Sequence, residues 1–220
     1  MHDGSEAAKP EGLYFVGVAA SAGGLEAVSM LVQNLPKDAN VVYVLAQHMS
    51  PTHKSLLSSL ISRETTLPVV ELDDPVKPVR GTIYVTPPNS DVTLSDGMLH
   101  LSAPSGHVAS PKPSADRLFK SIADECGEQC VAIVLSGTGS DGSYGVQAIR
   151  EAGGITIAQD TASAKYDGMP SSAVATGCVD LTLTPEQMGQ HLEKILATPR
   201  DLVDLKTINE IPSRLSDLLQ

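Results

Sequence analysis

The chain has 220 residues and a formal net charge of −11 at pH 7, so its length suits one α/β domain with a short appendage. An acidic surface repels nucleic acid and anionic lipid, which excludes both as expected partners. Hydrophobic residues make up 41% and aromatic residues only 3%. Small and aliphatic side chains must therefore fill the core, as they do in buried parallel sheets.

The cysteine count and the lack of a signal peptide or a long apolar run indicate the cellular compartment. The chain has three cysteines, Cys126, Cys130 and Cys178, and an odd, sparse set without a signal peptide favours a reducing environment. No apolar run approaches the roughly 20 residues that a membrane-spanning helix needs. We therefore expect a cytoplasmic protein without membrane insertion. Cys126 and Cys130 form a single pair without a second cluster, so no metal site is predicted.

The first part of the chain contains two strand–turn–helix units. Residues 1–12 are polar and are expected to form a disordered leader. The apolar runs LYFVGVA (13–19) and VVYVLA (41–46) predict buried strands. Each is followed by a small or polar turn and then by apolar residues at helical spacing, from Leu25 onward in the first unit and over 53–64 in the second.

The middle of the chain differs in pattern. Residues 67–101 contain short β segments separated by Pro, Gly, Asn and Asp. Asp96-Gly97 between two of these segments predicts a hairpin turn. Residues 105–114 form a polar loop rich in Pro and Ser.

The alternation of strands and helices then resumes. Helices are predicted over Ala115–Cys126 and Pro185–Leu196, and strands over 131–136, 155–159 and 179–183. Repeated strand–helix units predict an α/β fold, with a doubly wound, mainly parallel sheet, flanking helices and a small β-hairpin insertion. We assign one domain to residues 13–197, and we interpret residues 198–220 as a linker or trailing helix.

Three turns that follow predicted strands carry reactive side chains. In open α/β sheets, ligands bind beyond the carboxyl ends of the strands, where Ser21, His48 and Asp141 are expected to meet. A serine needs a neighbouring base to become a nucleophile, and a carboxylate fixes the tautomer of that base. Each residue alone has an ordinary alternative: a helix-capping serine, a surface or packing histidine, and a helix-capping aspartate. His53 is a nearby competitor for the role of base.

The sequence resembles the catalytic domain of chemotaxis protein-glutamate methylesterases (CheB). The matching segments lie in the family's order within residues 13–196, and their joint occurrence is highly specific. They are VGVAASAGGLEA (16–27), AQHMSP (46–51), IYVTPPN (83–89), VLSGTGSDGSYG (134–145), EAGGITIAQD (151–160) and YDGMPSSAVATGCVD (166–180).

The resemblance implies a serine esterase that hydrolyses glutamate γ-methyl esters on the cytoplasmic helices of chemoreceptors, with deamidation of glutamines by the same chemistry. It implies that Ser21, His48 and Asp141 form a catalytic triad, and that backbone N–H groups near Ala22 and Thr138 hold the oxyanion. No metal or organic cofactor is implied. Two further residues, Met169 and Pro170, are candidates for lining the substrate cleft; the alternative is that they shape the turn.

The sequence departs from the family pattern in ways that leave alternatives open. The classical enzyme carries an N-terminal receiver domain, and only a polar leader precedes the first predicted strand here. The segment SPTHKSLLSSL (50–60) looks more like the branch in which the esterase is fused to a chemotaxis methyltransferase. A methionine often stands where this chain has Thr138. A catalytically silent docking module and a nucleotide-binding α/β domain remain as alternatives, although the latter lacks the phosphate-binding fingerprint.

Overall fold

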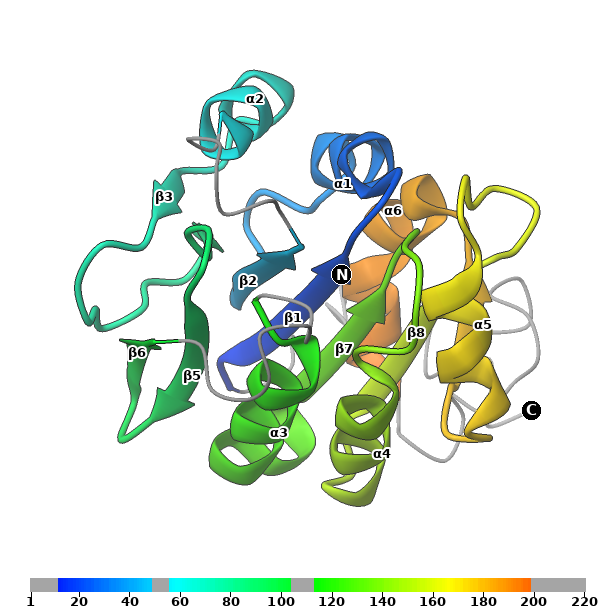
Figure 1. Cartoon of the computed structure of the whole chain (residues 1–220). Helices are drawn as coiled ribbons and strands as arrows, with labels where there is room; N and C mark the ends of the chain where they lie inside the picture. The colour runs from blue at the N-terminus through cyan, green and yellow to red at the C-terminus, as the bar shows by residue number, and fades with distance from the viewer. Residues whose placement is uncertain (1–11, 49–55, 104–112, 199–220) are drawn as a thin grey trace, which may run out of the picture.

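A computed structural model describes residues 12–48, 56–103 and 113–198. The leader over 1–11, the start of the predicted second helix at 53–55, most of the polar loop and residues 199–220 lie outside the described residues. The centre of the fold is a seven-stranded parallel sheet in the order β3-β4-β2-β1-β7-β8-β9 (Figure 1). Its strands are β1 (Tyr14–Ala20), β2 (Val41–Gln47), β3 (Val69–Glu71), β4 (Ile83–Val85), β7 (Cys130–Val134), β8 (Ile155–Gln159) and β9 (Leu181–Leu183).

Helices cover both faces of this sheet, which confirms the predicted doubly wound α/β class (Figure 1). Inward-facing residues of β1 alternate between the two sides: Val16 and Val18 pack on one side, and Phe15 and Ala19 on the other. The first side is covered by α1 (Gly24–Gln33), α2 (Leu57–Glu64) and α6 (Pro185–Ala197). The second is covered by α3 (Ala115–Cys126), α4 (Ser143–Glu151) and α5 (Gly168–Ala175).

The predicted hairpin is confirmed, and the structure also places two other short segments of the middle region in the parallel sheet. β5 (Asp91–Ser95) and β6 (Met98–Ser102) pair antiparallel in a separate two-stranded sheet. Asp96 has φ 51° and Gly97 has φ 69°, as a two-residue hairpin turn of the I′ type requires. The short strands β3 and β4, by contrast, join the edge of the parallel sheet, because the apolar IYV segment of β4 is fully buried beside β2.

Two glycines let α3 approach the centre of the fold. The aromatic ring of Phe119 is fully buried, and a Cβ built on Gly17 of β1 would lie 2.8 Å from that ring. A Cβ on Gly145 of α4 would lie 2.6 Å from the Phe119 Cβ. Because real Cβ atoms do not approach so closely, larger residues at either position would push α3 away. This close packing sets where the N-terminus of α3 lies.

The other predicted elements are confirmed with small shifts at their ends. The strand predicted over 131–136 is Cys130–Val134, and the one predicted over 179–183 is Leu181–Leu183, shifts that are ordinary for strand and helix ends. Cys126 ends α3, and the three cysteines are free thiols. Within the described part of the chain, none of the helices combines the length and apolar character that crossing a bilayer requires.

Candidate active site

Three neighbouring strands bring the candidate residues to one edge of the sheet. β1 lies between β2 and β7, so Ser21, His48 and the turn after β7 follow adjacent carboxyl ends. Backbone hydrogen bonds join these turns: the Ser21 N–H donates to the Ser136 carbonyl at 3.0 Å, and the His48 N–H donates to the Ala20 carbonyl at 2.9 Å. The side chains predicted to meet beyond the strand ends therefore start from turns that are fixed to one another.

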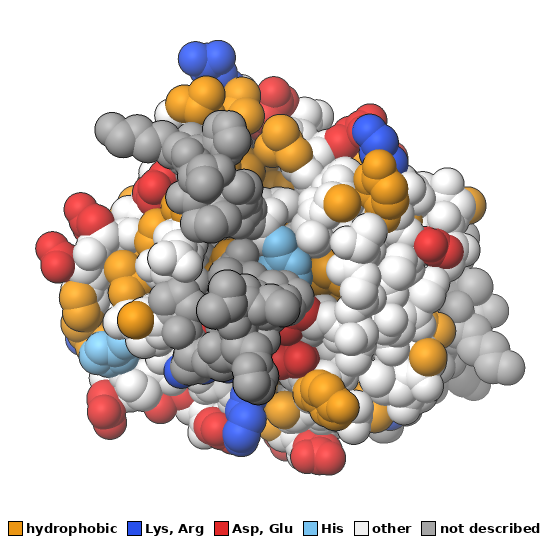
Figure 2. Space-filling view, in the orientation of Figure 1, with side chains coloured by type: hydrophobic (Ala, Val, Ile, Leu, Met, Phe, Trp, Pro, Cys, Tyr) orange, Lys and Arg blue, Asp and Glu red, His pale blue; other side chains and the backbone are white. Residues whose placement is uncertain are grey.

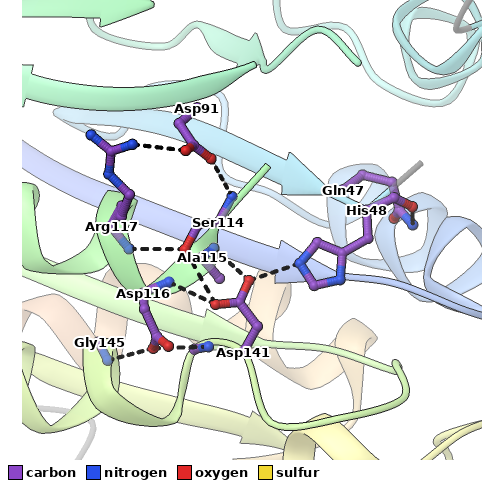
Figure 3. Close-up of polar contacts among 10 residues, drawn as sticks. Gln47, His48, Asp91, Ser114, Ala115, Asp116, Arg117, Asp141 and Gly145 are labelled. Carbon is purple, nitrogen blue, oxygen red and sulfur yellow. Dashed lines mark hydrogen bonds and ion pairs between the residues drawn. The ribbon is translucent and has the colours of Figure 1, made fainter. Parts of the chain in front are cut away.

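His48 and Asp141 are in direct contact. The His48 Nε2 lies 2.8 Å from the Asp141 Oδ2 (Figure 3), and the two side chains are only 10% and 8% exposed. A carboxylate in this position accepts the ring N–H and fixes the tautomer, which leaves Nδ1 of His48 as the nitrogen that can accept a proton. The Ser21 hydroxyl has no hydrogen-bond partner among the described residues; such bonds are often completed only when substrate binds.

The N-terminus of α3 holds the Asp141 carboxylate. Its Oδ2 accepts the Ala115 N–H at 2.7 Å, and its Oδ1 accepts the Asp116 N–H at 3.2 Å and lies 3.4 Å from the Ser114 hydroxyl (Figure 3). Burial raises the pKa of Asp141, but hydrogen bonds from His48, Ala115 and Asp116 outweigh it, so the pKa lies below its ordinary value. The helix terminus therefore keeps Asp141 ionised and points it at His48.

Neither Ser21 nor Asp141 caps the helix that follows it, which the ordinary alternatives required. The N-caps of α1 and α4 are Gly23 and Gly142, both left-handed, and neither helix has a side-chain cap from its own N-cap residue. Asp141 instead serves α3, a helix distant in sequence. His100 lies on β6 of the separate hairpin, while His53 and His107 lie outside the described residues.

The backbone of the candidate oxyanion region is open to a ligand. Ala22 and Thr138 are both exposed, and their N–H groups donate to no acceptor within the described ranges. The turn that carries Thr138 lies against the candidate nucleophile, because a Cβ built on Gly137 would be 2.8 Å from the Ser21 Cβ. Free N–H groups on this side of Ser21 are the kind of donor that binds a developing oxyanion.

The two candidate cleft residues are buried behind this turn. Met169 is 0% exposed, its backbone N–H donates to the Gly137 carbonyl at 2.8 Å, and its sulfur lies where a Cβ on Gly137 would be. Pro170 is also buried. Their packing favours the alternative that they shape the turn, and Tyr166 is an exposed hydrophobic side chain on the same segment.

Two buried glutamines and a serine also position the site, and sequence reasoning missed them. The Gln47 amide Nε2 donates to the Ser21 carbonyl at 2.8 Å. The Ser136 hydroxyl donates to the Ala22 carbonyl at 3.0 Å and accepts the Tyr166 N–H at 3.0 Å. The Gln159 Oε1 accepts the Ser136 N–H at 2.8 Å. The only signal in the sequence was a polar residue at the end of each apolar run.

An ion pair fixes the end of α3 on its other side. The Asp91 side chain is fully buried, accepts the Ser114 N–H at 2.7 Å and pairs with Arg117 at 2.8 Å (Figure 3). The residues that hold Asp141 are thus tied to the β5–β6 hairpin.

The space-filling view, in the orientation of Figure 1, shows a histidine beside acidic side chains in the middle of the visible face (Figure 2). The described residues contain no group of three or more His, Cys, Asp or Glu side chains arranged for a metal ion.

The arrangement has the parts of a nucleophilic hydrolase: a serine on a tight turn, an imidazole oriented by a buried carboxylate, and free backbone donors nearby. The order along the chain, Ser–His–Asp, differs from that of α/β-hydrolases. Only the spatial arrangement of these groups matters for the chemistry.

Comparisons with known proteins match most of the chain to one family. A family model described as CheB methylesterase matches residues 16–192. Protein-glutamate methylesterase FrzG of Myxococcus xanthus is 35% identical over 188 residues, which cover 85% of this chain and 56% of that protein. A protein-glutamate methylesterase/protein-glutamine glutaminase of Rhizobium meliloti is 35% identical over 182 residues, covering 82% and 51% respectively.

A solved structure has the same overall fold as this chain. The crystal structure of the Thermotoga maritima CheB methylesterase catalytic domain superposes with a TM-score of 0.75 at 26% identity, covering 84% of this chain and 99% of that one. The chain spans about half the length of the curated methylesterases named above. The family model covers most of the chain, in the segments that carry the site, and the chain therefore belongs to the CheB methylesterase family.

Proposed function

We propose that the chain hydrolyses glutamate γ-methyl esters on the cytoplasmic helices of chemoreceptors, through a Ser21–His48–Asp141 triad and an acyl-enzyme. The observation that carries the proposal is the His48–Asp141 pair, 2.8 Å apart and nearly buried beside the Ser21 turn. Relatives named protein-glutamate methylesterase support the substrate class. The double name of several relatives supports deamidation of glutamines as a second reaction of the same site.

In the first half of the proposed reaction, His48 Nδ1 accepts the proton of the Ser21 hydroxyl as its Oγ attacks the ester carbonyl. Backbone N–H groups at Ala22 and Thr138 bind the oxyanion of the tetrahedral intermediate, an interaction whose loss typically costs about 3 kcal/mol of activation free energy. The C–O bond to the methoxide then breaks, and protonated His48 gives its proton to the departing oxygen, so that methanol leaves.

The second half repeats these steps with water. The oxygen of a water molecule attacks the acyl carbonyl while His48 takes a proton from that water. His48 returns the proton to Ser21 Oγ when the acyl-enzyme bond breaks. A free glutamate side chain remains on the receptor. Ionised Asp141 stabilises the imidazolium that forms in both halves. With a glutamine substrate, ammonia takes the place of methanol. The sequence resemblance implies no cofactor for these steps, and that expectation stays a prediction.

The test is methanol release from methylated receptor cytoplasmic fragments. Ser21→Ala is expected to lower the rate by roughly 10³-fold or more, because a triad without its nucleophile retains only residual catalysis. Ser62→Ala is the matched control, since Ser62 is an exposed serine of α2 and its removal should leave the rate unchanged. Equal rates in wild type and Ser21→Ala would refute the assigned nucleophile. Binding of the receptor without methanol release would favour the docking module instead.

A further inference from the structure

The N-termini of α3 and α4 each bind a carboxylate that lies at the start of the other helix. Asp141, which precedes α4, accepts hydrogen bonds from the first two N–H groups of α3. Asp116, the second residue of α3, returns the interaction: its Oδ1 accepts the Gly142 N–H at 2.9 Å and the Gly145 N–H at 2.8 Å (Figure 3). The N-terminus of α3 thus binds a carboxylate from the turn that leads into α4, and the N-terminus of α4 binds a carboxylate from the first turn of α3.

Asp116 supplies the hydrogen-bond acceptor that the N-terminus of α4 lacks from its own N-cap residue. The N-cap of α4 is Gly142, which has no side chain to satisfy the first N–H groups of the helix. Both Gly142 and Gly145 are buried, so their N–H groups would be costly to leave without an acceptor. Gly142 directly follows Asp141, and the two hydrogen bonds to Asp116 therefore fix the backbone from which the Asp141 carboxylate extends.

Burial and the neighbouring negative charge make the ionised form of Asp116 energetically unfavourable at this position. The Asp141 carboxylate acts directly on Asp116. His48 lies beyond Asp141, and the Asp91–Arg117 pair lies at the same end of α3. Burial, together with the nearby Asp141 carboxylate, raises the pKa of Asp116 to about 6, although the hydrogen bonds from Gly145 and Gly142 oppose this. Two carboxylates this close repel each other, and a surface-facing aspartate on α3 would avoid that repulsion.

We propose that Asp116 is a positioning residue of the active site, which holds the start of α4 so that Asp141 stays in hydrogen-bond contact with His48. Asp116 does not touch the reacting atoms and acts only through Asp141. The inference rests on the proposed function in one respect: the value of the Asp141–His48 contact is its contribution to activating Ser21.

The test uses three variants and two readouts. Asp116→Ala removes the acceptor for Gly142 and Gly145. Asp116→Asn keeps an oxygen acceptor of the same size and removes the charge. Asp124→Ala is the matched control, because Asp124 lies on the same helix but is 65% exposed in a surface pair with Lys120.

The first readout is the proton resonance of the His48 Nε2–H, which reports the His48–Asp141 hydrogen bond without any substrate. The second is the rate at which Ser21 reacts with a fluorophosphonate, which needs an activated serine and no particular ester. We expect Asp116→Ala to lose the resonance and to react about 10- to 100-fold more slowly, the scale of a misplacement of about 1 Å. Asp116→Asn should keep the resonance and react within a few-fold of wild type.

Two outcomes would overturn the inference: Asp116→Ala matching Asp124→Ala in both readouts, or Asp116→Asn being as impaired as Asp116→Ala. If Asp116→Ala does not fold, Asp116→Glu replaces it, because the longer side chain keeps the charge but displaces the acceptor. The inference then requires Asp116→Asn to outperform Asp116→Glu, and the opposite order contradicts it. A wild-type protein that shows the resonance but neither reacts with the probe nor releases methanol would refute the proposed function alone.

Discussion

The side-chain amide of Gln47 links the backbones of the candidate nucleophile and base, Ser21 and His48. Its Nε2 donates to the Ser21 carbonyl at 2.8 Å and lies 3.3 Å from the carbonyl of His48. Gln47 ends β2 and is only 6% exposed, so water cannot readily replace these contacts. This buried amide group therefore holds the two turns together, in addition to the backbone hydrogen bond from the His48 N–H to the Ala20 carbonyl.

Replacing Gln47 with alanine should impair both stability and activity. Loss of the amide removes its hydrogen bonds to the Ser21 and His48 carbonyls, although the Ser21 carbonyl keeps the Gly24 N–H as a donor. An unsatisfied buried polar group typically costs about 1–3 kcal/mol. We expect the free energy of unfolding to fall by about that amount and fluorophosphonate labelling of Ser21 to slow by about 10-fold or more. Urea denaturation and labelling kinetics measure the two effects. Gln33→Ala, at an exposed glutamine of α1, is the control and should change neither.

A methyl group at Gly137 should block the site without greatly changing the fold elsewhere. The Cβ of alanine there would lie 2.8 Å from the Ser21 Cβ and would contact the Met169 sulfur, so the Ser21 turn must move. We expect Gly137→Ala to lower methanol release by about 10²-fold, as misplaced catalytic groups do.

Gly97→Ala provides the contrast for this prediction. A Cβ at Gly97 meets no atom within 4 Å, but the residue has a φ of 69°, which costs an alanine about 1 kcal/mol of strain. That variant should lose stability and keep its activity. An active Gly137→Ala protein would show that the Ser21 turn can shift without consequence.

The stability conferred by Asp141 should disappear in acid. Its pKa in the folded protein lies below the ordinary value of 3.8, so the folded state favours the ionised form. That contribution is fully present above the unfolded pKa and is lost as the pH falls through the folded pKa. Compared with Asp141→Asn in urea titrations between pH 2 and 7, about the range over which such carboxylates titrate, wild type should lose its advantage below about pH 4. A pH-independent difference between the two proteins would contradict the prediction.

Asp116 should show the opposite pH dependence. Its folded pKa is raised to about 6 from 3.8, so the folded state binds a proton more tightly than the unfolded chain does. Stability attributable to this group therefore falls as the pH rises between these two values and is constant above them. Asp116→Asn, which does not titrate, should become more stable relative to wild type across that interval. Parallel denaturation curves of the two proteins from pH 4 to 7, about the same interval, would exclude the raised pKa.

The sequence predicted the parts of the site that follow directly from strand ends. Apolar runs located β1, β2 and β7, and the carboxyl ends of parallel strands share one edge, so Ser21, His48 and Asp141 could be placed together before any distance was known. The Asp96-Gly97 turn was predictable for a similar reason, since the two positive φ angles it needs are rare outside such residues.

The supporting residues could not be predicted because their roles depend on contacts between distant elements. An aspartate in the first turn of a helix, such as Asp116, is common on any helix and gives no sign that it serves α4. Gln47 was expected only in the polar turn after the predicted strand 41–46, and the pattern did not show that it ends β2 and bonds to the Ser21 carbonyl. The strands β3 and β4 have three residues each, too few for periodicity to assign them to the parallel sheet. The fusion to a methyltransferase stays a prediction.

The central position of β1 determines when this site can form during synthesis. Val16 of β1 pairs with Tyr43 of β2 and with Val131 of β7, so the strand is completed by one neighbour made soon after it and another made much later. A nascent chain that ends before β7 can join Ser21 to His48 but lacks Asp141 and the Ser136 turn. Contacts of such long sequence separation also form slowly. Newly made chains should therefore stay inert toward esters until the residues up to and including Asp141 have left the ribosome.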